Sequence, residues 1–558
     1  MTADPEGYLA RRVLDALLRE DYGGLRRYVS RPAATAASPQ AEATPRAEPA
    51  TLLLPGGRSL RLCHDGFLAD HRVAADEDLR LAEVIAALRH LADPADDVAA
   101  FVRECRETLA TMRLHAAHSD EVIRRLERSP AYHDVLGAYL DHPAYPTARC
   151  RLGLSEQELR AYAPEFAPKF RLRWAAVNRS RVTVAGSRPD WWPAPADVAL
   201  PAAAMSWRDL FPVHPITATT LAQVPGNIAP GSAPGLELAP EPYLEVRPTL
   251  SMRTVVVAAD ATTHLKVPLP TSTLGRRNRR MITPGMLHDG ALVQRILAEI
   301  RTRAPRGTPV LLADEQTYGH AADPLLGYLV RRLPAAAAAG AVPVAALLAP
   351  APDSAPDPAP DSGGRYVIEE LTGDIAAFFD AYLRTLFGWH VALFGYGIAL
   401  EAHQQNVSVV PSGDAGLRLL IKDNDGALLD PAALARAGLG PVDVHDRRML
   451  TADREALARV FVTITLHLCA GAIAFGLAER GLLPLPVGLG LIRARLAEAI
   501  DEHDQPFLRA RTLDAERLPT KAMVTAGTLV DKARTGAQDI NKHYGPPGPN
   551  YLREDQCS

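Results

Sequence analysis

The stretch Gly397-Ile-Ala-Leu-Glu-Ala-His-Gln-Gln-Asn406 is an apolar run that ends in a polar cluster. A second apolar run, Leu417 to Ile421, ends in the cluster Lys422-Asp-Asn-Asp-Gly426. The β-rich runs on either side of a turn at Ser412 to Gly416 predict a hairpin that brings Asp423 back towards Asn406. The imidazole, amide and carboxylate groups so gathered suit Mg²⁺ and a polyphosphate better than a thiolate metal, and they predict a nucleotide site.

Each cluster also has a purely structural interpretation. The run Glu-Ala-His-Gln-Gln-Asn can be a solvated helix end. The run Asp-Asn-Asp-Gly is common in turns, because Asx side chains bond their own backbone and Gly accepts positive φ. A basic segment upstream favours the joint interpretation as a site.

That basic segment contains Ser251-Met-Arg-Thr254 and Lys266. Val255 to Ala259 and His264 to Leu269 are predicted strands, with Lys266 in the interior of the second. An unpaired ammonium inside an apolar strand is costly, and an anion would supply its partner. Four arginines between positions 276 and 280 suit phosphate and carboxylate oxygens. The alternative is a solvated or nucleic-acid-binding patch.

These residues resemble the IucA/IucC family, the NRPS-independent siderophore synthetases. The likeness includes the Ser-x-Arg-Thr run, Lys266 with Thr-Ser-Thr273, and both polar clusters. Three more stretches resemble family signatures in the family's order: His142-Pro-Ala-Tyr-Pro-Thr-Ala-Arg-Cys-Arg-Leu-Gly153, Tyr162-Ala-Pro-Glu-Phe166 and Pro212-Val-His-Pro215. The resemblance extends from about residue 140 to residue 430.

The chain departs from the family pattern at several positions. Tyr145 stands where the family has a second His, and Arg149 stands for its Lys, which keeps the charge but changes its geometry. Lys422 replaces the Arg before the family's metal-site Asp, which corresponds to Asp423. The spacing from Lys266 to the arginines also differs, so the equivalent arginine is left open.

The resemblance implies an α+β multidomain fold of thumb, fingers and palm, with ATP held between fingers and palm. We expect a mostly helical thumb over residues 1–141, fingers with an antiparallel sheet over residues 142–345, and a kinase-like palm over residues 346–558. The physical parallel with kinases is a His/Asn loop followed by an Asp-x-x-Gly turn that can coordinate Mg²⁺. Fold analogy alone does not fix the reaction.

The implied reaction is ATP-dependent siderophore synthesis in iron acquisition. A carboxylate of citrate, or of a related polycarboxylic acid, attacks the α-phosphate of ATP and releases pyrophosphate. An amine or hydroxyl nucleophile then displaces AMP from the acyl-adenylate. The resemblance thus implies a carboxylate–amine ligase that uses ATP and Mg²⁺, has a citrate-like acid and an amine as its small-molecule partners, and forms a homodimer.

The resemblance also implies roles for individual residues. The catalytic groups would be His403, Lys266 and Arg280. The ATP contacts would be Ser251, Arg253, Thr254, Lys266, Ser272, Thr273, Arg277, Arg279, Arg280, His403 and Gln405, with Arg280 as the first choice among the arginines. The metal ligands would be Gln405, Asn406 and Asp423, with Glu401 as a further candidate. Asp425 lies at a variable position of the motif and is interpreted as turn chemistry.

The carboxylates of the acid substrate need cationic or imidazole partners. The candidates are His142, Arg149, Arg151 and His214. For the two histidines the alternative is that His-Pro simply ends a helix or begins a strand, because the residue before Pro is biased towards extended conformations. Lys521 is a candidate for the nucleophile pocket.

Composition excludes several classes of partner. The chain has 558 residues, 47% of them hydrophobic, and a formal net charge of -4. The length predicts about two to four domains, and the charge gives no general attraction to nucleic acid or anionic lipid. The five cysteines show no Cys-x-x-Cys spacing, which indicates a reducing cytoplasm and argues against structural zinc. An N-terminus without an apolar h-region predicts no secretory signal.

The remaining segments are interpreted from periodicity and composition. Val460 to Leu477 is marginally long enough to span a membrane, but its internal polar residues and charged flanks favour a buried core helix. An Ala/Pro/Asp-rich stretch, Pro334 to Gly364, is expected to be a surface insertion or linker. Helices are predicted over Tyr8 to Tyr28, Ala82 to Leu126, Ile375 to Phe387 and Asp453 to Arg480, with a strand over Arg181 to Ala185 and a flexible loop over Arg31 to Ala50.

Two other functions are consistent with the same residues. A kinase-like phosphotransferase would cleave ATP to ADP, whereas the ligase would release AMP and pyrophosphate. A catalytically inactive binding subunit would keep the fold, but the presence of Lys266, His403, Asn406 and Asp423 argues against it.

Overall fold

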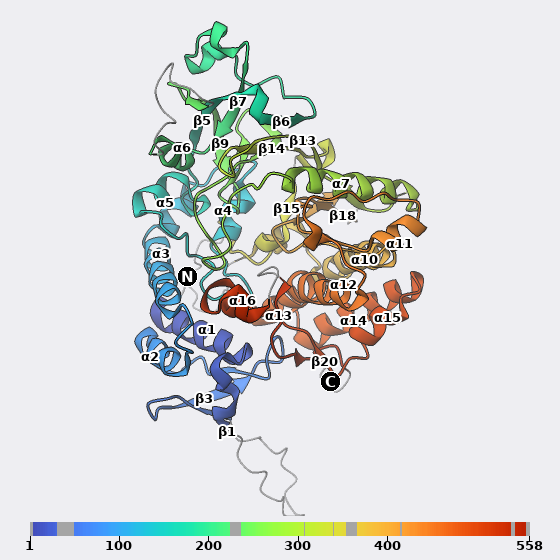
Figure 1. Cartoon of the computed structure of the whole chain (residues 1–558). Helices are drawn as coiled ribbons and strands as arrows, with labels where there is room; N and C mark the ends of the chain where they lie inside the picture. The colour runs from blue at the N-terminus through green and yellow to red at the C-terminus, as the bar shows by residue number, and fades with distance from the viewer. Residues whose placement is uncertain are drawn as a thin grey trace, which may run out of the picture.

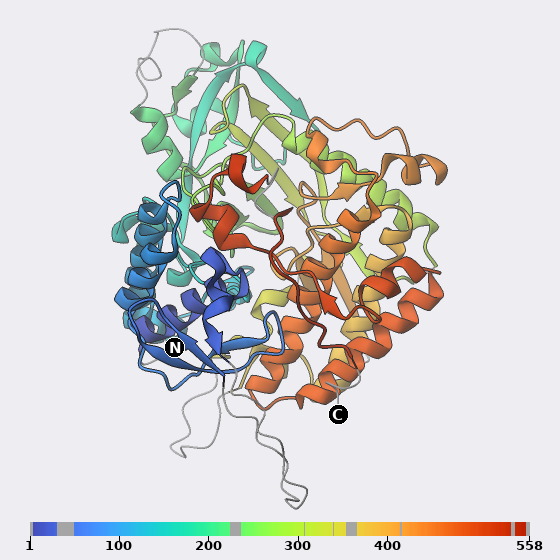
Figure 2. The ribbon, with the colours of Figure 1, turned by 60° about the horizontal axis from the view of Figure 1, so that its bottom comes forward.

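The protein is described by a computed structural model over residues 4–30, 50–223, 236–305, 307–338, 340–352, 365–412, 416–536 and 542–553. Figure 1 shows three groups of elements around a common centre: N-terminal helices at the lower left, a large sheet at the top and C-terminal helices at the right. Figure 2 shows the same grouping after rotation. The fold combines helices with an antiparallel sheet, as predicted.

The N-terminal group is mainly helical, as predicted. Its helices are α1 (Pro5–Arg19), α2 (Leu81–Leu91), α3 (Val98–Arg124) and α4 (Tyr132–Ala138). Helix α1 begins where the Asp4 side chain accepts a hydrogen bond from Gly7 N at 3.1 Å, with Pro5 at the first helical position. The predicted loop over residues 31–49 lies outside the described residues.

A small sheet between α1 and α2 is absent from the sequence-based expectations. Its strands pair in the order β1-β2-β3-β4, and all pairs are antiparallel. The strands are β1 (Val29–Ser30), β2 (Thr51–Leu53), β3 (Ser59–His64) and β4 (His71–Val73). Runs this short give too little alternation to signal a strand.

The large sheet at the top of Figure 1 is antiparallel throughout, in the order β6-β13-β14-β11-β10-β9-β5-β7, with β8 beside β5. Its strands are β5 (Phe170–Asn178), β6 (Val182–Ala185), β7 (Arg208–Val213), β8 (Leu236–Leu238), β9 (Tyr243–Pro248), β10 (Thr254–Val257), β11 (Asp260–Lys266), β13 (Asp314–Ala321) and β14 (Gly327–Arg332). Helices α5 (Glu156–Tyr162), α6 (Pro215–Ala222) and α7 (Met286–Arg303) accompany it.

Strand β11 ends earlier than predicted, so that Lys266 is its last residue and does not lie in the strand interior. The prediction was wrong because Pro268 and Pro270 follow, and a proline has no backbone N–H to donate to a neighbouring strand. Lys266 nevertheless lies between buried apolar neighbours, Leu265 and Val267.

The predicted hairpin is confirmed as β17 (Val407–Ser412) and β18 (Gly416–Ile421), although residues 413–415 lie outside the described part. Val407 pairs with Ile421, so the two polar clusters meet at the open end of the hairpin. The hairpin belongs to a sheet of order β12-β18-β17-β15, in which β12 (Val310–Leu312) is parallel to β18 and β15 (Val342–Pro343) is antiparallel to β17.

The expectation of a surface insertion at residues 334–364 is wrong for the part that the structure describes. Helix α8 (Ala335–Ala338) leads into β15, and Val342, Val344 and Leu347 are buried in the main core. An Ala/Pro-rich composition is typical of linkers, but small apolar side chains also pack closely where a strand joins a sheet. Residues 353–364 of this stretch lie outside the described residues.

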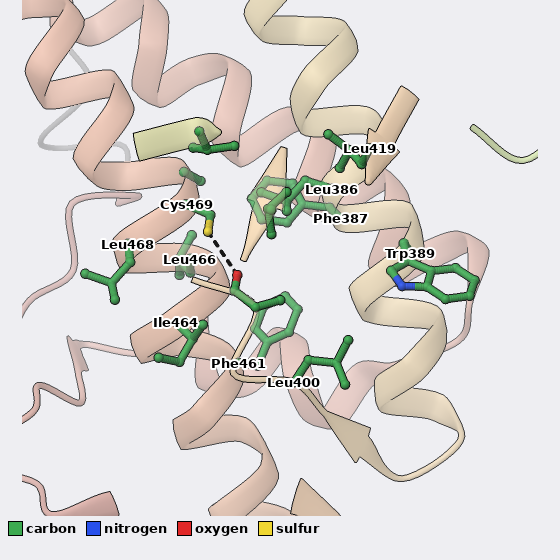
Figure 3. Packing of buried hydrophobic residues seen from close by; sticks show 14 of the residues in the cluster. Leu386, Phe387, Trp389, Leu400, Leu419, Phe461, Ile464, Leu466, Leu468 and Cys469 are labelled. Atoms are coloured by element: carbon green, nitrogen blue, oxygen red, sulfur yellow. Dashed lines mark hydrogen bonds between the residues drawn. The ribbon is translucent and has the colours of Figure 1, made fainter. Parts of the chain in front are cut away.

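The C-terminal group holds the largest apolar core, part of which Figure 3 shows. Its helical segments are α9 (Val367–Leu371), α10 (Ile375–Gly395), α11 (Pro431–Arg436), α12 (Arg454–Val460), a π-helical turn Phe461–Gly471, α13 (Ala472–Glu479), α14 (Leu485–Glu502), α15 (Pro506–Arg511) and α16 (Lys532–Thr535). The short pairs β16 (Ile398–Ala399) with β19 (Leu428–Leu429) and β20 (Arg517–Leu518) with β21 (Gly548–Pro549) complete it.

The apolar stretch Arg454–Glu479 is long and apolar enough to cross a membrane, but 89% of its most apolar window is buried inside the protein. This burial agrees with the predicted core helix. Within it, Cys469 donates its thiol hydrogen to the carbonyl of Ala402 at 3.1 Å, the dashed contact in Figure 3. This contact attaches the core helix to Ala402, the residue immediately before His403.

Candidate functional site

The two polar clusters and the basic segment meet at Lys266. This side chain is 1% exposed, and its ammonium lies 2.6 Å from Asp423 Oδ1 and 2.7 Å from Asp425 Oδ2. A buried ammonium does have the partner that its burial requires. Asp425, interpreted from the sequence as turn chemistry alone, is therefore also an ion-pair partner of Lys266.

Two residues that the sequence patterns did not single out support Asp423. Arg331 on β14 donates from Nε to Glu315 Oε1 at 2.6 Å, and its Nη2 lies 3.1 Å from Asp423 Oδ1. Glu315 on β13 in turn accepts the backbone N–H of Asp423 at 2.8 Å. Arg331 follows an apolar run in β14, a signal like the one at Lys266, whereas β13 has the polar sequence DEQTYGHA and gives no such signal for Glu315.

Asp423 is held in an unusual conformation and ionisation state. Its φ of 66° lies in the left-handed region, which is uncommon for residues other than Gly. Burial alone would raise the pKa of its carboxyl group, but Lys266 and Arg331 outweigh burial and hold this pKa well below its usual range. The carboxylate is therefore ionised and fixed in position before any ligand binds.

The first polar cluster forms a tight turn against the second. The backbone N–H of Asn406 donates to His403 O at 2.8 Å, and the N–H of Lys422 donates to Asn406 O at 3.1 Å. A Cβ at Gly426 would lie 2.6 Å from Glu401 Oε2, so a larger residue at position 426 would displace the Glu401 side chain from its present position. Glu401, His403, Asn406 and Asp423 thus lie at one end of the hairpin.

His403 is neutral at physiological pH. Its pKa is lowered to about 4, chiefly by burial; Asp423 opposes this shift, and the cations Lys521, Arg280 and Lys422 contribute to it. Its Nε2 lies 3.4 Å from Asn406 Nδ2, and its Nδ1 lies 3.3 Å from Gln405 N. The electrostatic influence of Lys521 places that residue near the same site.

The basic segment contributes two guanidinium groups that interact electrostatically with Asp423 and Asp425. Thr254 pairs with Lys266 across β10 and β11, and Ser251 Oγ accepts Thr254 N–H at 3.0 Å, which positions Arg253. Arg253 donates to Met281 O at 3.1 Å, and Arg280 donates from Nε to Thr273 Oγ1. Among the described residues, neither guanidinium forms an ion pair.

The electrostatics of these two arginines show an excess of positive charge. Burial lowers the pKa of Arg253; Asp423 and Asp425 oppose this shift, and Arg331 adds to it. Burial also lowers the pKa of Arg280 to about 9, with Arg253 and Arg151 adding to the effect and Asp423 and Asp425 opposing it. An anion bound between them would relieve this repulsion.

The other arginines of the segment face elsewhere. Arg276 forms an ion pair with Asp97 on the N-terminal side of α3, Arg277 donates to Ala526 O at 3.1 Å, and Arg279 is exposed. Ser272 forms a bridge with Arg279. Arg280 is therefore the arginine that the structure brings to Lys266, Asp423 and Asp425.

Four residues were expected to hold a carboxylate substrate, and their placements differ. His142 lies close enough to His403 for their charges to interact, and its pKa is lowered to about 3, first by burial and then by His403. Arg149 is buried and engaged by Asp141 at 2.7 Å and His115 at 3.1 Å. Arg151 lies 3.5 Å from Glu165.

His214 caps a helix in an apolar environment. It is 0% exposed, and its Nδ1 accepts the N–H of Ile216 at 3.2 Å at the start of α6. Its ring packs edge-on against Tyr162 and Phe170, with centroids 5.1 and 5.3 Å away. Burial alone lowers its pKa to about 3. The capping role agrees with the structural alternative for a His-Pro pair.

His214→Asn is expected to change the pH dependence of stability. The pKa of His214 is about 3 in the folded protein and near 6.5 when unfolded, so below pH 6.5 only the unfolded state gains its proton. The wild-type free energy of unfolding should fall by about 2 kcal/mol relative to the variant between pH 6.5 and 5. Urea unfolding of both proteins at the two pH values measures this difference, and parallel losses would contradict it.

Tyr145, the departure from the family's second His, belongs to a buried hydrogen-bond network. Its hydroxyl donates to Glu104 Oε1 at 2.7 Å. Thr147 donates to the same oxygen at 2.5 Å, and Thr528 donates to Glu104 Oε2 at 2.7 Å. The network joins α3 to segments far away in the sequence, so Tyr145 has a structural role here.

Tyr145→Phe is expected to lower the free energy of unfolding by about 1–2 kcal/mol, because a buried carboxylate loses one of its donors. Tyr28→Phe is the control, since the Tyr28 hydroxyl accepts a hydrogen bond from Arg27 at 3.4 Å at an exposed position. Denaturant unfolding of both variants compares them. Equal stability of the two variants would show that the Glu104 contact contributes nothing.

Comparison with known proteins places these observations in a family. Residues 136–349 match the IucA / IucC family, and residues 376–536 match the family described as ferric iron reductase FhuF-like transporter. The second match covers His403 and Asp423. The two matches together include both halves of the candidate site.

Two curated relatives come from rhizobia. The uncharacterized protein y4xN of Sinorhizobium fredii (strain NBRC 101917 / NGR234) is 31% identical over 350 residues, 55% of this chain and 54% of the relative. The rhizobactin siderophore biosynthesis protein RhbC of Rhizobium meliloti (strain 1021) is 28% identical over 320 residues, 52% of this chain and 53% of the relative. The chain spans about half the length of these curated relatives.

A solved structure shares the fold over nearly the full length. ATP-bound aerobactin synthetase IucA from a hypervirulent pathotype of Klebsiella pneumoniae superposes with a TM-score of 0.71 at 20% identity, covering 98% of this chain and 99% of that one. The fold is thus shared well beyond the segments in which the sequences match. Residues 136–349, the part of the chain that includes Lys266, are similar to the IucA / IucC family.

Proposed function

We propose that the protein is an ATP-dependent siderophore synthetase that joins a carboxylate of citrate, or of a related polycarboxylic acid, to an amine or hydroxyl nucleophile. The observation that carries the proposal is the pair of guanidinium groups, Arg253 and Arg280, which interact electrostatically with Asp423 and Asp425 and form no ion pair among the described residues. Such a site suits a polyphosphate. The family match and the ATP-bound state of the IucA structure support this choice of ligand.

The residues present also fit a metal ion. Lys266 and Arg331 both form ion pairs with the same oxygen of Asp423, Oδ1. We propose that the other oxygen, Oδ2, is a metal ligand. Gln405 and Asn406 supply amide oxygens on the facing turn, and Glu401 supplies a further carboxylate. Hard oxygen donors of this kind are preferred by Mg²⁺, which would supply charge neutralisation of the phosphates when bound.

The chemistry requires activation of the acid, because a carboxylate has no good leaving group for an amine to displace. A carboxylate oxygen attacks the α-phosphorus of ATP, and the bond to the pyrophosphate oxygen breaks. The amine nitrogen then attacks the acyl carbon, AMP leaves with the oxygen that joined them, and the amine proton is lost to solvent or a base. ATP, acid and amine thus give amide, AMP and pyrophosphate.

The residues of the site have separable tasks in this sequence. Lys266 has three N–H groups, two of which face carboxylates, so the third can reach a phosphate oxygen. Arg253 and Arg280 can stabilise the charge that accumulates on the phosphate oxygens as the pentavalent centre forms. His403, neutral because of its low pKa, can donate one N–H to the α-phosphate without titrating near pH 7.

The acid is assigned to the side of the site where His142 lies near His403. Arg151 is electrostatically linked to Arg280, so it is the second candidate on that side. Arg149 is engaged by Asp141 and His115, and we propose that it orients the His142 segment and does not contact the acid itself. The thumb, fingers and palm boundaries and the homodimer that the family resemblance implies stay predictions.

Product analysis tests the proposed reaction. Purified protein with Mg²⁺ and ATP is incubated with citrate, citryl amides, 2-oxoglutarate or succinyl amines, each with a set of polyamines, diamino acids and hydroxylated diamines. We expect at least one pair to yield AMP and pyrophosphate in equal amounts with an amide detected by mass spectrometry. Formation of ADP would support the phosphotransferase, and no nucleotide cleavage with any pair would support the inactive subunit.

A further inference from the structure

A cluster of three potential metal ligands lies outside the residues assigned to ATP, acid and metal above. His288 and Asp289 begin the first turn of α7, and His445 lies in the loop after α11. One ligand atom from each of the three side chains lies within 4.8 Å of the other two. The residues come from segments more than 150 positions apart, since the Asp289 to His445 separation is 156.

The geometry of the cluster suits a divalent transition-metal ion. His288 Nδ1 and His445 Nδ1 lie 3.3 and 3.2 Å from the same oxygen, Asp289 Oδ1. Two ligands bonded to one zinc ion at about 2.0–2.1 Å are separated by roughly 3–3.5 Å in tetrahedral geometry, so both nitrogen–oxygen distances already fit. Two imidazoles and one carboxylate are ligands that zinc and other first-row metals accept.

The burial of the three side chains also fits a metal site. Asp289 is 0% exposed, whereas the side chains of His288 and His445 are 36% and 62% exposed. The carboxylate is fixed from beneath, because Asp289 Oδ1 accepts His445 N–H and Oδ2 accepts Asp446 N–H, each at 2.9 Å. Such hydrogen bonds orient a ligating carboxylate, and the exposed imidazoles leave a path for an ion from solvent.

A purely hydrogen-bonded cluster explains the arrangement less well. Asp289 Oδ1 is approached by three nitrogen atoms: the backbone N of His445 and the Nδ1 atoms of both histidines. For both imidazoles to donate, each would have to carry its proton on Nδ1 and point it at an oxygen that already accepts a backbone N–H. A cation in contact with that oxygen and with two imidazole lone pairs satisfies all three side chains at once.

The cluster is distinct from the proposed nucleotide site but adjoins it. The next residue of α7 is Gly290, where a Cβ would lie 3.4 Å from Asp425 Cβ. The Asp425 carboxylate in turn pairs with Lys266. The start of α7 therefore carries two residues of the His–Asp–His cluster and also packs against Asp425, which pairs with Lys266.

We propose that His288, Asp289 and His445 bind one divalent transition-metal ion of the zinc class, which fastens the loop at His445 to the first turn of α7. The site differs in chemistry from the oxygen-rich Mg²⁺ site, since imidazole ligands favour zinc over magnesium. It is independent of the proposed reaction. A negative result for Zn²⁺ binding and a negative result for the proposed ligase reaction can therefore be told apart.

The test is equilibrium dialysis of the full chain, freed of metal with EDTA and returned to chelator-free buffer, against Zn²⁺ in excess Mg²⁺. Excess Mg²⁺ occupies the oxygen-rich site and leaves the imidazole ligands available. We expect the wild type to bind one Zn²⁺ more than the H288A/H445A double variant, with each single variant weakening binding by about 100-fold or more, since loss of outer-shell partners alone costs about 10–100-fold. His90→Ala is the matched control, because His90 is exposed on α2.

A second measurement needs no variant and so does not depend on correct folding of the mutants. Diethylpyrocarbonate modifies accessible histidines, and mass spectrometry locates the modified residues. Zn²⁺ should protect His288 and His445 of the wild-type chain and leave His90 reactive. Equal Zn²⁺ binding by the wild type and the double variant, or equal modification of His288 and His445 with and without Zn²⁺, would overturn the proposal.

Discussion

Lys266→Met is expected to lower the rate of pyrophosphate release by about 10³-fold or more, because the variant loses the ammonium that faces both carboxylates and the proposed phosphate. Loss of a single preorganised donor commonly costs about 10²–10³ in rate, and Lys266 also carries a full charge in a buried position. The measurement is single-turnover pyrophosphate release at saturating ATP and acid.

Loss of stability must be separated from loss of activity in this variant. Removing one partner from a buried ion pair commonly costs about 3–5 kcal/mol, and Asp425 would be left without Lys266 while Asp423 keeps Arg331. The double variant K266M/D425N removes the stranded charge. We expect it to regain most of the lost stability in urea unfolding and none of the activity, so recovered pyrophosphate release would show that Lys266 acts only on the fold.

Asp423→Asn is expected to lower pyrophosphate release by about 10³-fold and to raise the Mg²⁺ concentration for half-maximal rate. The amide keeps the shape of the side chain and can still accept the Lys266 and Arg331 contacts through its oxygen, whereas the charge of the proposed metal ligand is lost. The backbone contact of residue 423 with Glu315 does not involve the substituted atoms.

Asp425→Asn is the matched control for this effect. It makes the same chemical change two residues away, in the same turn and on the other carboxylate of Lys266. We expect a loss of roughly 10- to 20-fold, with an unchanged Mg²⁺ dependence, because removal of one charge-assisted contact costs about 1.5 kcal/mol or slightly more. Equal losses of pyrophosphate release in the two variants, or a larger change of Mg²⁺ dependence in Asp425→Asn, would contradict the choice of Asp423 over Asp425 as the metal ligand.

The parts of the site that follow from local sequence were predicted well. The hairpin that joins Asn406 to Asp423 follows from two β-rich runs of similar length and a turn between them. The choice of Arg280 first among four arginines agrees with its electrostatic interaction with Asp423 and Asp425, although its contact with ATP stays a prediction. The two strands of the hairpin pair across one turn, so their partners are close in the sequence.

The parts that depend on distant segments were not predictable in the same way. Glu315 and Arg331 hold Asp423 only because β13 and β14 are placed beside the hairpin by the sheet. The local sequence around Asp425 indicates only a turn residue. Its ion-pair partner, Lys266, is 159 positions away and therefore leaves no local signal. The composition of the stretch around Val342 is typical of a linker, and composition does not show that a short strand there pairs with β17.

The measurement that tests the central claim most directly uses the acid that turns over in the product analysis, labelled with ¹⁸O in its carboxylates. If a carboxylate oxygen attacks the α-phosphorus and the amine later attacks the acyl carbon, that oxygen stays on phosphorus. Mass spectrometry should then find one ¹⁸O in AMP and none in pyrophosphate. Label in inorganic phosphate together with ADP, or unlabelled AMP, would contradict an acyl-adenylate formed at the Lys266 and Asp423 site.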